Sequence, residues 1–117
     1  MKKLIKKWLG LSDYKVYSAL LSQTNTNNPT AIVLENTLGE IYFNYTGVGQ
    51  YEIKNDANLF ANDKTFLVIQ GSHDGDINSA IIIDKLYYKD SNTINCIVGA
   101  GWDGLLNKTS VEIRVYN

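Results

Sequence analysis

The chain has 117 residues, of which 44% are hydrophobic and 20% charged, and this size and composition are typical of one globular domain. Four lysines and no acid lie in residues 1–11, whereas residues 12–117 hold seven basic and twelve acidic side chains, a net charge of −5. An acidic body with one arginine argues against nucleic-acid binding, the single Cys96 excludes an internal disulfide framework, and no apolar run is long enough for a membrane span.

The first segment, MKKLIKKWLGL, has the spacing of a short amphipathic helix. Leu4, Ile5, Trp8 and Leu9 recur at helical intervals, and the lysines fall on the other side. Lys6 and Lys7 interrupt the apolar residues, so we expect no signal peptide. We therefore predict an N-terminal helical arm over residues 1–13, for anchoring or oligomerisation.

From Tyr14 onward the pattern changes to short strands separated by turn residues. The last strand alternates most clearly, with Val111 and Ile113 facing inward and Glu112 and Arg114 outward. Turns are predicted at residues 47–49 and 91–92. The predicted strands are residues 14–23, 31–36, 40–46, 50–55, 64–70, 80–90, 93–100 and 109–117.

This spacing of about eight strands without long helices predicts an all-β fold. We expect one antiparallel β-sandwich over residues 14–117, jelly-roll-like in its connections. Within it, Phe43 and Tyr45 share one face of a strand and Tyr42 lies on the other, while Cys96 alternates with Ile94 as a small core residue.

One long stretch carries a resemblance to a known group of proteins. Lys15–Ile41 contains KVYSALLSQ, a Thr- and Asn-rich loop with Pro29, and then VLENTLG. It resembles virion-type β-domain proteins of phages and prophages of Bacteroidetes, crAss-like ones included, and KTFLVIQ and SVEIRVYN are also similar to that group. The resemblance implies a structural role in a capsid fibre, tail component or knob, and it carries over no functional residue.

The chain offers few residues for chemistry. His73, Asp74 and Asp76 in the segment SHDGD are metal-ligand types, but their spacing favours an acidic turn between strands over a calcium loop. His73 is the single histidine and has no evident nucleophile as a partner. We therefore predict no catalytic residue, no metal site and no cofactor, and the case for an enzyme is poor.

Two features are predicted to bind partners. The apolar face of the arm, formed by Leu4, Ile5, Trp8 and Leu9, suits a groove on another protein, copies of itself, or an anionic membrane surface. We favour docking or self-association, because an acidic body is repelled by an anionic bilayer. Trp102, in the glycine-rich segment GAGWDG, stacks on a sugar, contacts a subunit or folds back to close the sandwich.

The leading hypothesis is thus a non-catalytic virion structural protein that acts by assembly and surface recognition. It would be assembled in the bacterial cytoplasm, contact other virion proteins through the arm, and form a homo-oligomer, for which analogy with phage fibres favours a trimer. The hypothesis includes host surface glycans as a further partner. The alternative is a carbohydrate-binding module that uses loop aromatics such as Trp102.

Overall fold

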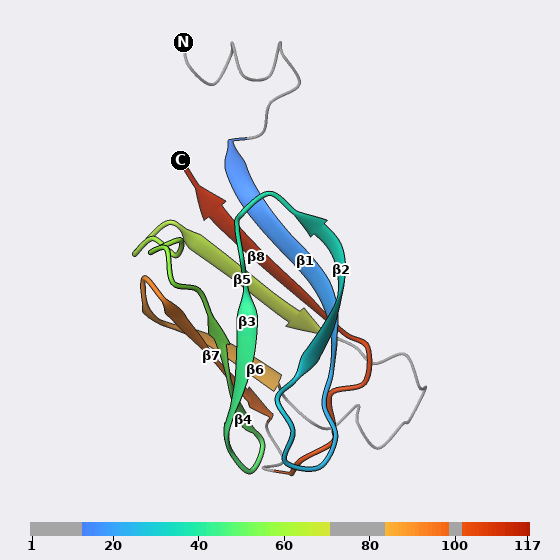
Figure 1. The fold of residues 1–117 in the computed structure, drawn as a ribbon. Coiled ribbons are helices and arrows are strands. Elements are labelled where there is room, and N and C mark those ends of the chain that lie inside the picture. Colours follow the sequence, from blue (N-terminus) through green and yellow to red (C-terminus); the bar gives the residue numbers. More distant parts are fainter. Residues whose placement is uncertain (1–12, 71–83, 99–101) are drawn as a thin grey trace.

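The computed structural model describes residues 13–70, 84–98 and 102–117 (Figure 1). The predicted N-terminal helix and the SHDGD segment lie outside these residues. The described part contains no helix and forms eight strands. They are β1 (Tyr14–Ser22), β2 (Thr30–Asn36), β3 (Tyr42–Gly47), β4 (Gln50–Lys54), β5 (Thr65–Gln70), β6 (Asp84–Asp90), β7 (Thr93–Val98) and β8 (Thr109–Tyr116).

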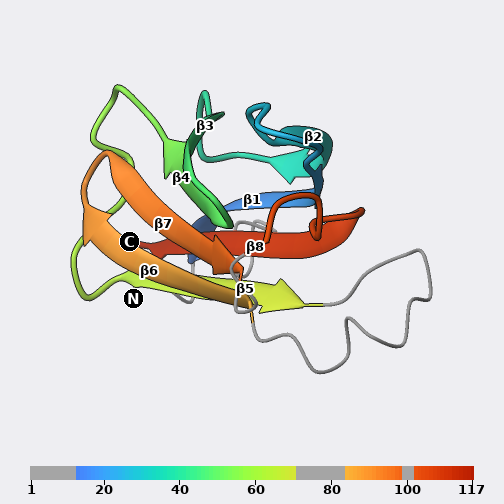
Figure 2. The same cartoon turned by 90° about the horizontal axis from the view of Figure 1, so that it is seen from below.

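The strands form two antiparallel sheets of four. We call the sheet with the order β2-β1-β8-β5 the first sheet, and the sheet with the order β3-β4-β7-β6 the second sheet. β5 packs beside β6, so the two sheets meet along one side (Figure 2). The prediction of an all-β, antiparallel, sandwich-like fold is confirmed. The jelly-roll arrangement is not established by this strand order and stays a prediction.

The core lies between the two sheets and consists mainly of the residues that face inward at every second position of the strands. Tyr17 of β1 and Phe43 of β3 come from different sheets, and their ring centroids are 6.4 Å apart. Ile113 of β8 and Ile53 of β4 are fully buried. Complete burial of one such side chain stabilises the fold by about 1.5–3 kcal/mol. The apolar residues at every second position of these strands are buried in this core, and this packing holds the two sheets together without a disulfide.

The predicted faces are confirmed where the structure describes them. Val111 and Ile113 are buried between the sheets, whereas Glu112 and Arg114 point to the outer face of β8. Tyr42 is exposed while its neighbour Phe43 packs against the core. The thiol of Cys96 is buried in the core as expected.

The two predicted hairpin turns are also confirmed. Gly49 has a φ of +67° in the turn between β3 and β4, a value that glycine adopts at little cost. Between β6 and β7, the amide of Asn92 donates to a side-chain oxygen of Asp90 at 2.9 Å. This hydrogen bond lowers the pKa of the Asp90 carboxyl below its usual value.

Candidate functional site

The outer face of the first sheet is unusually apolar. Leu34 of β2 is 64% exposed and Phe66 of β5 is 51% exposed, and Ile32 and Val68 are also exposed. The outer face of a sheet in a sandwich normally carries polar residues, which alternate with the apolar ones that face the core. Exposed apolar residues gathered on one face mark an interaction surface.

The strand register explains how these side chains come together. β1 pairs with β8 and β8 with β5, so Ser18, Glu112 and Val68 form one row across the outer face. Leu20 pairs with Ser110 of β8 and with Ile32 of β2, which places these three in the next row. Residues in one row point to the same side of the sheet. The four strands of the first sheet therefore build a single surface.

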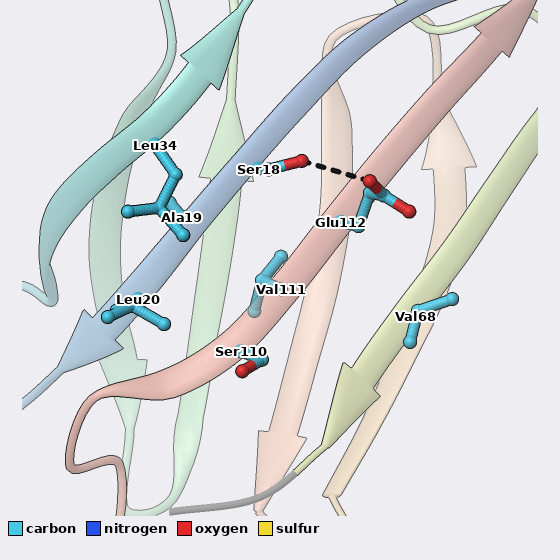
Figure 3. A pocket seen from close by; sticks show the side chains of 8 residues that line it. All are labelled: Ser18, Ala19, Leu20, Leu34, Val68, Ser110, Val111 and Glu112. Carbon is cyan, nitrogen blue, oxygen red and sulfur yellow. Dashed lines mark hydrogen bonds between the residues drawn. The ribbon is translucent and has the colours of Figure 1, made fainter. Parts of the chain in front are cut away.

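A β-bulge brings Leu34 into this surface. The pairing of β1 with β2 shifts between Ser18 and Ala19, so that Ser18 faces Glu35 and Ala19 faces Val33. Leu34 is the extra residue of the bulge. Bulges redirect a side chain away from the regular alternation. The side chain of Leu34 consequently lines the outer face beside Ser18 and Leu20 (Figure 3).

These residues enclose a shallow groove with a volume of about 190 Å³. Leu20, Leu34 and Val68 stand around the two small residues Ser18 and Ser110, whose short side chains leave a hollow on the face of the sheet (Figure 3). Ala19, Val111 and Glu112 complete the lining. Because small-molecule sites usually have volumes of about 300–1,000 Å³, this groove suits an apolar side chain of another protein better than a cofactor.

The charged groups beside the groove are already engaged with each other. Glu112 accepts hydrogen bonds from the hydroxyl of Ser18 and from Nε of Arg114, both at 3.0 Å. The guanidinium carbon of Arg114 lies 4.8 Å from the ring centroid of Tyr14 and 5.9 Å from that of Phe66. A hydrogen bond with Tyr116, followed by the charge of Glu112, raises the pKa of Arg114 above its usual value. These contacts hold the surface in shape and leave it predominantly apolar.

The outer face of the second sheet is different. It carries charged side chains on β4 and β6, and Lys89 lies 4.0 Å from Glu52 across these strands. Lys54 donates to the hydroxyl of Thr93 at 2.8 Å. Tyr87 is exposed among these charges. The second sheet thus has the solvated outer face that a sandwich ordinarily shows, and the apolar face belongs to the first sheet.

Trp102 lies at one end of the sandwich and is 65% exposed. It therefore does not fold back to close the sandwich, and Leu106, which is 1% exposed, packs into the core from the same loop. The carboxylate of Asp103 accepts from the hydroxyl of Tyr45 and from the amide of Gly49, both at 2.9 Å. The residue next to Trp102 is thus held against β3 and the following turn.

A buried glutamine joins this loop to the loop that contains Pro29. Gln23 is 3% exposed, and its Oε1 accepts from the hydroxyl of Tyr51 at 2.8 Å and from the amide of Gly104 at 2.7 Å. Its Nε2 donates to the carbonyls of Asn25 at 2.8 Å and Asn27 at 3.1 Å. The loop end of the sandwich is therefore fixed by side-chain hydrogen bonds, which makes it a stable platform for Trp102.

The structure describes only part of the predicted site. Leu4, Ile5, Trp8 and Leu9 lie outside the described residues, so their partner-binding role stays a prediction. Trp102 lies at the loop end, whereas the groove is built by the outer rows of β1, β2, β5 and β8. Sequence reasoning missed the groove, although the consecutive apolar residues of AIVLEN and KTFLVIQ were a signal, because strands with one solvated face alternate more strictly.

The described residues contain little else for chemistry. No three His, Cys, Asp or Glu side chains among them gather closely enough to hold a metal ion. Burial raises the pKa of the Cys96 thiol to about 12, so this thiol stays protonated and unreactive near neutral pH. Over the described ranges, no helix has the length and hydropathy that crossing a membrane requires.

Comparisons with protein-family models, with curated proteins and with solved structures gave no match to this chain. The resemblance of Lys15–Ile41 to phage virion-type proteins therefore remains a prediction from the sequence. The fold and the groove define the chain as an all-β domain with exposed apolar residues on the outer face of its first sheet.

Proposed function

We propose that this protein is a non-catalytic structural component of a phage virion and works by assembly through the outer face of the first sheet. The virion setting comes from the resemblance of Lys15–Ile41, and a jelly-roll relationship is part of the same proposal. The chain contacts other virion proteins through this face and through the arm residues Leu4, Ile5, Trp8 and Leu9. Formation of a homo-oligomer, a trimer by analogy with fibres, completes the proposal.

The contrast between the two outer faces is the observation that carries the assembly role. Leu34, Val68 and Phe66 leave the first sheet apolar and hollowed, while Lys89 and Glu52 make the second sheet polar. Covering an exposed apolar side chain by a partner contributes roughly 25 cal/mol for each Å² removed from water. A partner that covers the first sheet therefore gains far more than one that covers the second.

The test is the protein composition of purified virions from the bacterium that carries the gene. Quantitative mass spectrometry is expected to find the chain as a virion protein in a fixed ratio to the major capsid protein. Its absence from intact particles, with the chain present in the surrounding lysate, would refute the virion role.

Matched variants test which face makes the contact. Leu34→Glu together with Val68→Glu places two charges on the groove, and both side chains are exposed in the isolated chain, so folding is expected to persist. The expected result is loss of incorporation into particles. Tyr87→Glu makes the same kind of change on the second sheet, where Tyr87 is 44% exposed, and should leave incorporation unchanged. Equal loss in both variants would contradict the assignment of the face.

The exposure of Trp102 supports a second candidate, a carbohydrate-binding function. An indole that is 65% exposed beside the anchored Asp103 is available to stack on the apolar face of a sugar ring. A glycan array should then give a signal with the wild-type chain that Trp102→Ala abolishes and Trp102→Phe retains in part. A signal that survives Trp102→Ala would exclude this residue as the stacking platform.

A further inference from the structure

β2 is an open edge of the first sheet. Among the described strands it pairs only with β1, and β5, at the other edge, packs beside β6 (Figure 1). On the second sheet, the edge strand β3 has one amide, that of Tyr45, covered by the side chain of Asn28 at 2.8 Å. An edge strand presents unpaired backbone groups that another strand can bind.

β2 also lacks most of the features that protect such edges. Proteins block edge strands with lysine, proline, short length or bulges. β2 has seven residues, contains neither lysine nor proline, and carries one charge, Glu35. The bulge at Leu34 is present, but it leaves this side chain 64% exposed. As far as residues 13–70, 84–98 and 102–117 are concerned, the edge is therefore long, apolar and open.

Both faces of β2 expose apolar side chains. Ile32, which pairs with Leu20, lies on the outer face and is 53% exposed. Val33, which pairs with Ala19, lies on the core side and is still 50% exposed. A helix or a flat surface covers one face of an edge strand, whereas a neighbouring strand covers both because its side chains alternate. The occupant that fits this edge is a β-strand.

We propose that β2 pairs antiparallel with β2 of a second copy of this chain, around a two-fold axis at Val33. Val33 is the middle of β2, and this register pairs the regular residues around it, whereas the bulge at Leu34 interrupts the alternation toward Glu35 and Asn36. The register places Ile32 opposite Leu34 of the second copy, both on the outer face, and it keeps Glu35, the one charged residue of β2, away from Glu35 of the second copy. Apolar residues meet on both faces and no like charges lie opposite each other, which is the electrostatic condition for a stable cross-strand pair.

The resulting dimer has one continuous sheet formed by the first sheets of both copies. Its outer face places the two grooves side by side, so a larger apolar surface is offered to a third protein. This inference specifies a two-fold self-contact for the proposed assembly function, in place of the trimer that analogy with fibres suggests, and it does not depend on the virion setting.

Disulfide cross-linking tests both the contact and its register. In the proposed pair the two Val33 Cα atoms lie about 4.5–5.5 Å apart, a separation that a disulfide spans. Val33→Cys in the full chain is therefore expected to give a covalent dimer under mild oxidation. Ile32→Cys is the matched control, since the two Ile32 Cα atoms are about 8 Å apart in this register. Cys96 is buried and does not compete.

Analytical ultracentrifugation of the wild-type chain measures dimer formation without any substitution, so misfolding of a variant cannot affect this result. The expected result is a monomer–dimer equilibrium that Leu34→Lys shifts to monomer. Monomer at every concentration, or equal cross-linking of the Val33→Cys and Ile32→Cys variants, would overturn the inference. A stable trimer without Val33 cross-links, or pairing of β2 with the arm or with a different protein, would overturn it as well.

The two proposals fail separately. A chain that is found in virions but gives no Val33→Cys dimer contradicts the edge pairing alone. A chain that dimerises through β2 but is absent from virions contradicts the virion role alone.

Discussion

Replacing Gln23 by alanine tests how the loop end of the sandwich is held. The substitution removes the acceptor of the Tyr51 hydroxyl and of the Gly104 amide, and the donor to the carbonyls of Asn25 and Asn27. Tyr51 is 1% exposed, so its hydroxyl is left buried without its partner.

The expected cost follows from these contacts. A buried hydroxyl without a partner costs about 1–3 kcal/mol, and each lost hydrogen bond about 0.5–1.5 kcal/mol. The amide of Gly104 is on an exposed residue, so water replaces its partner at a smaller cost. We expect Gln23→Ala to lower the free energy of unfolding by about 3 kcal/mol, a large share of the roughly 5–15 kcal/mol of an ordinary domain.

Urea denaturation followed by circular dichroism measures this loss. With an m-value of about 2 kcal/mol/M, typical of small domains, the midpoint should fall by about 1.5 M. Gln70→Ala, at an exposed glutamine, is the matched control and should change stability by less than about 0.5 kcal/mol.

A double-mutant cycle with Tyr51→Phe identifies the cause. In the wild-type chain, removing the hydroxyl loses a hydrogen bond, so it should destabilise by about 1 kcal/mol. After Gln23→Ala the same change removes an unpaired buried group, so it should be neutral or stabilising. The reasoning is refuted if Tyr51→Phe costs the same in both backgrounds, or if Gln23→Ala costs less than about 1 kcal/mol.

Three further predictions concern the core and a turn. Burial raises the pKa of Cys96 from its reference value of 9.0 to about 12, so the stability that comes from its protonated form is complete below pH 9.0 and is lost as pH rises toward 12. Between these pH values, the difference in free energy of unfolding between the wild-type chain and Cys96→Ala should therefore change by at most about 1.4 kcal/mol per pH unit. Denaturation experiments that give a constant difference across this range would contradict the prediction. Gly39 has a φ of +147°, a backbone conformation that residues with a side chain rarely adopt, and a Cβ there would also require the end of the Leu59 side chain, 2.6 Å away, to shift. Gly39→Ala should therefore lower stability by roughly 1–3 kcal/mol in urea titrations, whereas Gly47→Ala should cost less; equal costs would refute the argument from backbone strain. Ile113→Ala should cost about 2–5 kcal/mol by the same assay, and a loss below about 1 kcal/mol would show that Ile113 does not pack in the core.

The sequence predicted the strands well because their signals are local. The alternation of Val111, Glu112 and Ile113 follows from the two-residue period of a strand, which any strand with one buried face must satisfy. Turn residues such as Gly49 and Asn92 act on their immediate neighbours. These features require no knowledge of which strands lie next to each other.

The position of Trp102 illustrates what the sequence left open. Its loop is held by Asp103, whose partners Tyr45 and Gly49 lie 58 and 54 residues away along the chain. No local pattern connects such distant residues. The alternatives of an exposed and an inward indole were therefore equivalent until the packing of the loop against β3 was known.

The sequence by itself determined the fold class, the approximate positions of the strands and inward residues such as Val111, Ile113 and Cys96, since alternation and turn chemistry are properties of short segments. Only the tertiary structure decided that the apolar run of β2 lies at a sheet edge and that Leu34 and Val68 meet across Ser18 and Ser110. Strand order results from the simultaneous packing of all eight described strands, and a consecutive apolar run such as Ile32, Val33 and Leu34 suits a buried central strand as well as an exposed edge.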